Sequence, residues 1–477
     1  MRDSIFRYGC CQAAAVTVDI TPVENMYHRM WGAALHDQAV GIHQPLEANL
    51  LLLQSSTGAQ GESVLVVSLD HCLFWKRDLD SIKSIVVETT GFADDQIVVF
   101  FTHTHAAGLM DTTRGSLPGG DLIAPYLAEV ADRLAVAATG LQERLCDVWL
   151  TGATGACSLA ANRDLWDSKR QQFVCGYNPD GDADPTVMTI RITDLQGELI
   201  AVLVNYACHP TTLAWDNQLI SPDYVGGMRQ TLRHALGDIP IPFIQGASGD
   251  VGPREGFVGD VGVAEKNGRQ LGLATLESLA AMPEEPAEFS YDGPVLSGAT
   301  IGTWSYKPFT ADRLKQFHNY RKVAGETKLP YREDLGTLEQ TEADLDRLLE
   351  ESEVEGQTTA QRRDQRALIE RLQRKRTRFS DLTDASGYPY SIRGWQFGEI
   401  GLLAFNGEMY NILQTNLRSA FPDQALIVGT LADGSQCWYL PQSSSYGQGL
   451  YQEDASVIAR GGLEQLCDAT IELFKEG

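Results

Sequence analysis

Basic residues are scarce in this sequence compared with acidic ones. The 477 residues include 38 Lys and Arg against 63 Asp and Glu, a net charge of −25. Nucleic acids and anionic membranes are bound through clustered Lys and Arg, so the charge argues against either as the main partner. No apolar run approaches the roughly 18 residues that a membrane span needs. We therefore expect a soluble protein with no nucleic-acid or membrane partner.

Two further absences concern the compartment. The nine cysteines include no C-x-x-C pair, which favours free thiols in a reducing compartment over a disulfide framework or a zinc ribbon. The first 22 residues carry an acid at Asp3 and lack a long apolar stretch, so we expect no signal peptide. The sequence predicts a cytoplasmic location.

Short apolar, β-branched runs separated by turn residues dominate the chain. Helical patterns alternate with these runs, which predicts an α/β fold of mixed β-sheets flanked by helices. A short Gly-containing loop joins the runs 188–194 and 198–207, which should pair antiparallel. The expected strands are 47–54, 63–70, 96–103, 147–153, 188–194 and 198–207, and the expected helices are 78–89, 122–140, 224–236 and 263–281.

Residues 309–382 differ from this pattern. Leucines recur at helical spacing in a part with eight acids between Glu339 and Glu355, and again in a part with eight bases between Arg362 and Arg378. Two oppositely charged helices predict a helical hairpin whose basic helix pairs with its acidic neighbour. β-like sequence resumes afterwards, so we expect one domain over 1–477 with the hairpin inserted within it.

Histidines that follow apolar strands are the first candidates for chemistry. His103 and His105 form an H-x-H pair after the run QIVVFF, and on a strand residues i and i+2 point to the same side. Two neutral imidazoles suit zinc, although two histidines that only hydrogen-bond in a loop remain an alternative. His209 follows LIAVLV in the same way, and His71, after Asp70, is a competing ligand.

Three other segments combine polar residues with strand ends. Gly246, Gly249 and Gly252 lie in a loop whose glycines allow positive φ and close approach, but the lysine of a phosphate-binding loop is missing. Glu408 follows GLLAF, where it is either a ligand or a favourable charge before a helix. Tyr439 and Tyr451 lie in a polar loop, where half-buried packing is the alternative.

Taken together, the segments resemble the neutral ceramidase family of zinc-dependent amidases. The resemblance runs over nearly the whole chain, and no single block carries it. The matching blocks are VDITP (18–22), FTHTH (101–105), ANRD (161–164), VNYACHPTT (204–212), ISPDYVG (220–226), GASGDVGP (246–253), FNGE (405–408) and the pair Tyr439 and Tyr451. It implies the catalytic-domain fold of that family and one Zn²⁺ per chain.

The resemblance also implies roles for individual residues. The matching zinc ligands are His103, His209, Glu408 and Tyr439. His105 would hold or deprotonate the attacking water, and Arg163 and Tyr451 would hydrogen-bond the oxyanion or the leaving group. In this reading the zinc lowers the pKa of water to about 7 and polarises the scissile carbonyl.

Departures from the family pattern change the expected substrate. Gly252 stands where ceramidases carry a catalytic serine, and the sequence offers no match to their C-terminal immunoglobulin-like domain. We expect a hydrolase that cleaves an amide, or a related C–N or ester bond, in a small soluble, sugar-like molecule and not in ceramide. An amidohydrolase-type barrel and a non-catalytic binding or assembly protein with a degenerate site are the alternatives. A homo-oligomer stays open.

Overall fold

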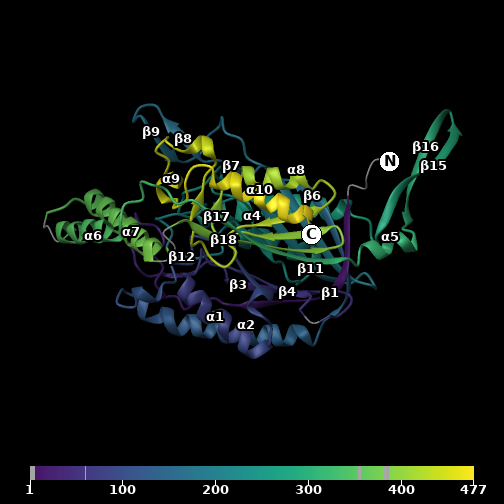
Figure 1. Ribbon diagram of the computed structural model, residues 1–477, viewed down its shortest axis with the longest axis horizontal. Helices are drawn as coiled ribbons and strands as arrows, with labels where there is room; N and C mark the ends of the chain where they lie inside the picture. Colours follow the sequence, from purple (N-terminus) through teal and green to yellow (C-terminus); the bar gives the residue numbers. More distant parts are fainter. Residues whose placement is uncertain (1–5, 60, 353–355, 381, 383–385, 477) are drawn as a thin grey trace.

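Two β-sheets packed face to face form the centre of the molecule (Figure 1). The computed structural model describes residues 6–476 except 60, 353–355, 381 and 383–385. The larger sheet has the strand order β13-β11-β10-β6-β1-β3-β4-β5, with bounds Phe243–Gln245, Leu199–Tyr206, Thr186–Asp194, Cys146–Ala156, Arg7–Asp19, Glu47–Gln54, Ser63–Leu69 and Ile97–Phe101. The smaller sheet has the order β17-β18-β19-β21, with bounds Tyr320–Leu329, Tyr388–Phe397, Ile400–Ala404 and Ala425–Gly429.

Helices cover the outer faces of both sheets. Because side chains alternate along a strand, Leu50 and Leu52 of β3 pack against the helical layer while Leu51 and Leu53 pack against the smaller sheet. Burial on both faces explains why β3 is a continuous leucine run rather than an alternating one. The helices over the larger sheet are α1 (Lys76–Thr90), α2 (Ile123–Gln142), α3 (Tyr224–Leu236) and α4 (Val261–Ala281), and those over the smaller are α8 (Ile412–Ala420) and α10 (Gly462–Glu476).

The predicted α/β class is confirmed, including the antiparallel pairing of β10 with β11, where Met188 lies opposite Asn205. Most neighbouring strands of the larger sheet are antiparallel. A (β/α)₈ barrel needs eight parallel strands, so the amidohydrolase-barrel alternative is wrong. Within the two large sheets, the parallel pairs are β4 with β5, β11 with β13 and β19 with β21. The loops after these strands build the site described below.

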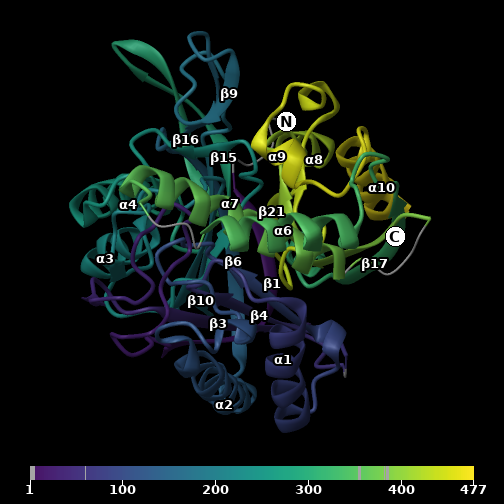
Figure 2. The same ribbon diagram turned by 90° about the vertical axis from the view of Figure 1, so that its left-hand side faces the viewer.

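Two helices project from the sheets at the left of Figure 1. They are α6 (Leu338–Ser352) and α7 (Thr359–Ser380), which pack against each other, and α7 crosses in front of the strands in Figure 2. The helical segment begins later than the expected residue 309, because 309–337 contains α5 (Ala311–Gln316) and β17, an edge strand of the smaller sheet. Residues 353–355, between the two expected helices, and 381, near the expected end of the hairpin, lie outside the described residues.

The charges of α7 are satisfied differently from the expectation. We expected its bases to pair with the acids of α6. In the described part of the chain, Arg366 pairs with Asp37 at 2.6 Å and Arg371 with Asp454, both acids of the body. The reason is orientation: part of the basic side of α7 faces the body, and no ion pair joins α7 to α6 within the described residues, so the predicted pairing is wrong there.

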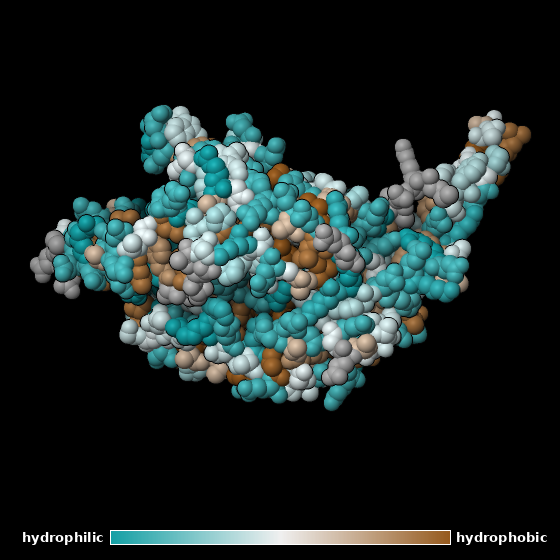
Figure 3. All heavy atoms as spheres, viewed as in Figure 1, coloured by the Kyte–Doolittle hydropathy of each residue, from teal (hydrophilic) through white to brown (hydrophobic). Residues whose placement is uncertain are grey.

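A two-stranded arm extends from the opposite end of the molecule (Figure 1). It consists of β15 (Ala287–Ser297) and β16 (Ala299–Pro308), and Figure 3 shows hydrophobic side chains at its tip. Leu296 is 83% exposed and Trp304 56%. The arm lies away from the strand ends that carry the candidate site. Nowhere in the described chain is a helix both long and apolar enough to cross a membrane.

Candidate active site

Three side chains from distant parts of the chain converge at one end of the sheets. The Nε2 atoms of His103 and His209 are 3.1 Å apart, and Glu408 Oε2 lies 3.3 Å from the first and 3.9 Å from the second. All three side chains are buried, with at most 6% of Glu408 exposed. The cluster combines two nitrogens and one carboxylate, a donor set that suits zinc.

Hydrogen bonds to carbonyl groups orient both imidazoles. His103 Nδ1 lies 2.7 Å from the Cys72 carbonyl oxygen, and His209 Nδ1 lies 3.3 Å from that of Ser248. A carbonyl oxygen only accepts, so each Nδ1 carries its own proton and the two Nε2 atoms face each other; two neutral rings would bring two lone pairs together. The two facing nitrogens need a cation or a proton between them.

The spacing of the three atoms fits a metal ion. Bonds of about 2.0–2.1 Å in a tetrahedral zinc site place neighbouring ligand atoms roughly 3.3 Å apart. Two of the three observed distances, 3.1 and 3.3 Å, match this edge. Glu408 Oε2 is buried, and its ion-pair neighbours among the described residues are the two histidines of the same cluster, so it is available to a metal that they share. The residues present therefore fit zinc.

A second potential cluster shares one of these residues. Cys72, His103 and His105 also bring ligand atoms within 4.8 Å of one another. The Cys72 sulfur is 3.4 Å from His103 Nδ1, but that nitrogen already donates to the Cys72 carbonyl oxygen. The cluster with His209 and Glu408 keeps the free Nε2 of His103, so it is the better metal site.

The bend after β5 brings His103 and His105 together. We expected strand alternation to align them, but β5 ends at Phe101 and His103 has φ = 69°, in the left-handed region. For a residue other than glycine this conformation costs of order 1 kcal/mol and recurs at functional sites. The two rings nevertheless meet, with centroids 4.9 Å apart. The alternation argument was wrong about the backbone.

Glu408 and Tyr439 are held opposite each other by a short parallel ladder. Glu408 begins β20 (Glu408–Met409) and Tyr439 begins β22 (Tyr439–Leu440), and the two residues are register partners. Burial, reinforced by the Glu408 carboxylate, raises the pKa of the Tyr439 phenol well above 10. A neutral phenol oxygen therefore lies beside the carboxylate of the cluster.

The surroundings of the cluster shift the pKa values of its histidines in opposite directions. Burial acts to lower the pKa of His103, but Cys72 and Glu408 outweigh it and raise that pKa well above 6.5. Burial lowers the pKa of both His209 and His105, and their cationic neighbours lower it further. His105 is thus a neutral base, with its Nε2 3.1 Å from His209 Nε2 and its ring 5.1 Å from that of Trp31.

Arg163 and Tyr451 reach the same place from other elements. Arg163 is 4% exposed, and it donates from Nε and Nη2 to the Gly249 carbonyl oxygen at 3.1 and 2.7 Å and from Nη2 to the Tyr439 hydroxyl at 3.1 Å. Tyr451 begins α9 (Tyr451–Ala455), and its ring centroid is 5.7 Å from that of Tyr439. The structure therefore brings together all seven residues proposed from the sequence: His103, His105, Arg163, His209, Glu408, Tyr439 and Tyr451.

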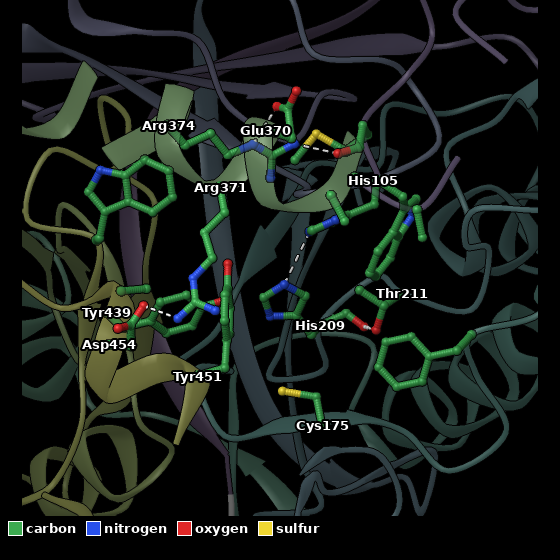
Figure 4. A pocket seen from close by; sticks show the side chains of 18 of the residues that line it. His105, Cys175, His209, Thr211, Glu370, Arg371, Arg374, Tyr439, Tyr451 and Asp454 are labelled. Atoms are coloured by element: carbon green, nitrogen blue, oxygen red, sulfur yellow. Dashed lines mark hydrogen bonds and ion pairs between the residues drawn. The ribbon is translucent and has the colours of Figure 1, made fainter. Parts of the chain in front are cut away.

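A cavity of about 480 Å³ opens beside the cluster (Figure 4). One wall contains His105, Arg163, His209, Tyr439 and Tyr451, and the other is formed by α7. From the sequence, α7 was expected to be part of a self-paired hairpin and not of the site. The spacing of its charged residues could have indicated its role in the site, because Glu370, Arg374 and Arg378 recur every four residues and so share one side of a helix.

His71, the competing ligand proposed from the sequence, lies outside the cluster. Its Nε2 hydrogen-bonds the Tyr126 hydroxyl at 2.7 Å, and its ring packs against Phe74 with centroids 4.9 Å apart. Complete burial lowers the pKa of His71 to about 3, so it is a neutral packing residue.

The glycine loop approaches the site closely without positive φ. Gly246, Gly249 and Gly252 are not among the residues with left-handed φ, so that part of the expectation is wrong. A Cβ on Gly249 would lie 2.8 Å from the Glu408 carbonyl oxygen. A Cβ on Gly252 would meet nothing nearer than Thr211 Oγ1 at 3.6 Å, an ordinary contact. Close packing requires glycine at 249, and space does not require it at 252.

Serine at position 252 is therefore expected to be tolerated. We expect Gly252→Ser to change the free energy of unfolding by less than about 0.5 kcal/mol, because the added Cβ makes only ordinary contacts. Gly249→Ser should cost about 1–3 kcal/mol through overpacking against the backbone of Glu408. Urea denaturation of the two variants measures both values. Equal losses at the two positions would contradict the argument.

Comparison with known proteins supports the architecture. No protein-family profile and no curated protein matches the sequence. Among solved structures, the neutral ceramidase of Pseudomonas aeruginosa superposes with a TM-score of 0.65 at 15% identity, covering 99% of this chain and 74% of that one. A ceramidase complexed with C2 gives a TM-score of 0.63 at 15% identity, covering 99% and 76%. The predicted resemblance is confirmed at the level of structure: this chain has the neutral ceramidase fold.

Proposed function

We propose that the protein is a zinc-dependent hydrolase that cleaves an amide or a related C–N or ester bond in a small soluble molecule. The observation that carries the proposal is the pair of buried Nε2 atoms that face each other at 3.1 Å, with Glu408 Oε2 only 3.3 Å from that of His103. His103, His209, Glu408 and Tyr439 would hold the metal. The fold shared with ceramidases supports the same reaction class, although it shows only the architecture.

The side chains around the cluster suit hydrolysis. A zinc ion bound there supplies a Lewis acid, which lowers the pKa of water to about 7 and polarises a carbonyl group. His105, held neutral by burial, accepts a proton at a ring nitrogen. Arg163 and Tyr451 donate hydrogen bonds where negative charge develops on the substrate oxygen. Arg163 is held in place by the Gly249 carbonyl oxygen, so it needs little reorganisation during the reaction.

The cavity supports a small polar substrate rather than ceramide. Its volume of about 480 Å³ is in the range of sites for small molecules, roughly 300–1,000 Å³. Four arginines line it, and two acyl chains would cover these guanidinium groups with hydrocarbon in place of water. A small polar molecule, such as a sugar derivative, satisfies them better.

Metal analysis combined with a substrate panel tests the proposal. Protein purified without chelators is expected to contain about one zinc per chain and to hydrolyse at least one compound among N-acetyl sugars, N-acetyl amino acids and simple esters, but not ceramide. Chelation should abolish turnover and zinc should restore it. Less than a tenth of an equivalent of bound zinc would refute the metal site. Bound zinc without turnover of any compound would favour the non-catalytic binding protein.

A further inference from the structure

Arginines of α7 give the cavity a charge opposite to that of the whole protein. The charged residues that line it, histidines aside, are four arginines and two acids, a balance of 4 − 2 = +2 in a chain of net charge −25: Arg163, Arg371, Arg374, Arg378, Glu370 and Asp454. A concave site of one sign raises the local concentration of ligands of the other sign. The cavity therefore favours an anion.

Arg378 lacks the partner that the other arginines of α7 in this wall possess. Arg371 pairs with Asp454, and Arg374 Nε lies 2.8 Å from Glu370. Arg378 is 6% exposed, and within the described residues no carboxylate lies within 4.0 Å of it. Nη1 donates to the Ala455 carbonyl oxygen at 2.7 Å, while Nε is buried without a hydrogen-bond partner. An unpaired buried guanidinium is costly, so this group is prepared for an anion that comes from outside the chain.

Stacking involves a face of this guanidinium and not its edge, where Nη1 is bonded to the Ala455 carbonyl oxygen and Nε has no partner among the described residues. The guanidinium carbon atom lies 4.3 Å from the centre of the Trp438 ring, so the indole covers one face. The N–H groups in the plane of a guanidinium form a fork that matches a carboxylate. Phosphate also accepts such bonds, but the planar edge and the single unpaired charge match a carboxylate better.

Arg378 lines the same cavity as His105 and His209, which belong to the metal cluster or contact it. In Figure 4, Arg371 and Arg374 enter from α7 while His105 and His209 face the same space. Resting on the proposed hydrolase function, we propose that the substrate is an amide that carries a carboxylate: the carboxylate binds Arg378, with Arg374 beside it, and the amide lies at His105, His209 and Arg163. Arg378 is then a specificity-determining residue, and an N-acyl amino acid is the substrate class.

Kinetics on matched substrates tests the assignment. The probes are N-acetyl amino acids and the corresponding neutral carboxamides. We expect Arg378→Met to raise KM for the carboxylates about 10- to 100-fold, because a charged hydrogen-bond partner is lost, and to raise KM for the neutral compounds much less. Arg376→Met is the matched control, since Arg376 is exposed on the same helix and does not line the cavity. A wild-type enzyme that prefers the neutral compounds would overturn the proposal.

Binding and stability separate this proposal from the hydrolase function. N-acetylglycine and inorganic phosphate, titrated by calorimetry into the zinc-loaded and chelator-treated proteins, should show carboxylate binding that Arg378→Met weakens at least tenfold. Arg378→Met should keep or raise Tm, because it removes an unpaired buried charge. Carboxylate binding without any hydrolysis sinks only the hydrolase function. Hydrolysis that is indifferent to the carboxylate, stronger binding of phosphate, or a large loss of Tm sinks only the role of Arg378.

Discussion

Replacing His209 by alanine is expected to remove most of the bound zinc and to lower kcat/KM more than 100-fold. Loss of a residue that only supports a metal ligand already costs roughly 10- to 100-fold, so loss of a ligand itself should cost more. His209 is central because its Nε2 is 3.1 Å from the Nε2 atoms of both His103 and His105. Removing the His209 ring takes one nitrogen ligand from the metal. It also removes the ring that lies beside His105, the proposed base.

Elemental analysis and kinetics at saturating zinc measure the two effects of His209→Ala separately. His234→Ala is the matched control, because His234 is exposed on α3 and its Nδ1 bonds only the Gln230 carbonyl oxygen of its own helix. The control should keep the wild-type zinc content and rate. If His209→Ala retained one zinc per chain with unchanged affinity, the facing nitrogens would be joined by a proton and not by a metal.

The fold could be predicted from the sequence because its strands are buried on both faces. Runs such as 47–54 are continuously apolar, and turn residues separate them, so β3, β10 and β11 fall within one or two residues of their expected bounds. The arm of β15 and β16 could not be predicted in this way because most of its side chains are exposed. A sequence pattern shows which segments are buried and says little about strands that pack against nothing.

That these residues converge could be predicted from the family resemblance and not from their spacing in the sequence. His103 and Glu408 are 305 residues apart, and only the pairing of strands across two sheets brings them within 3.3 Å. The bend at His103 is a backbone conformation that no residue type there predicts. The role of α7 was missed because its bases could pair equally well with the acids of α6. The orientation of the helix decides which acids they meet, and that depends on packing.

Glu370 fixes that orientation, and Glu370→Gln is expected to be the most destabilising change on α7. The carboxylate is 3% exposed and lies 2.7 Å from Arg114, 2.8 Å from Arg374 and 3.6 Å from Arg29. Neutral glutamine would leave three arginines without their shared anion. Breaking a buried ion pair in this way costs about 3–5 kcal/mol. We expect a loss of that order in the free energy of unfolding, measured by urea denaturation at pH 7.

The helix should also lose its place over the cavity. Arg374 is positioned by Glu370 and lines the wall that faces the metal cluster. In Glu370→Gln we therefore expect faster hydrogen exchange across α7, together with a higher KM for any substrate that contacts this wall. Asp364→Asn is the matched control, because Asp364 is exposed on the same helix and pairs only with the neighbouring Arg363. Equal effects of the two variants would show that α7 is docked by other contacts.

The pKa of Glu370 decides in which direction its contribution to stability changes with pH. Burial alone would raise the pKa of Glu370, but Arg374, Arg114 and Arg29 outweigh it and lower the pKa to about 2 from the ordinary 4.5. The unfolded chain therefore binds a proton at Glu370 between these values while the folded protein does not, so stability falls as the pH falls through this window. The contribution is complete above about pH 4.5 and is lost near pH 2. The stability difference between wild type and Glu370→Gln should thus be constant from pH 8 to about 5.5 and shrink below pH 4.5. A difference that grew as the pH fell would mean that the Glu370 carboxylate is not what holds the three arginines.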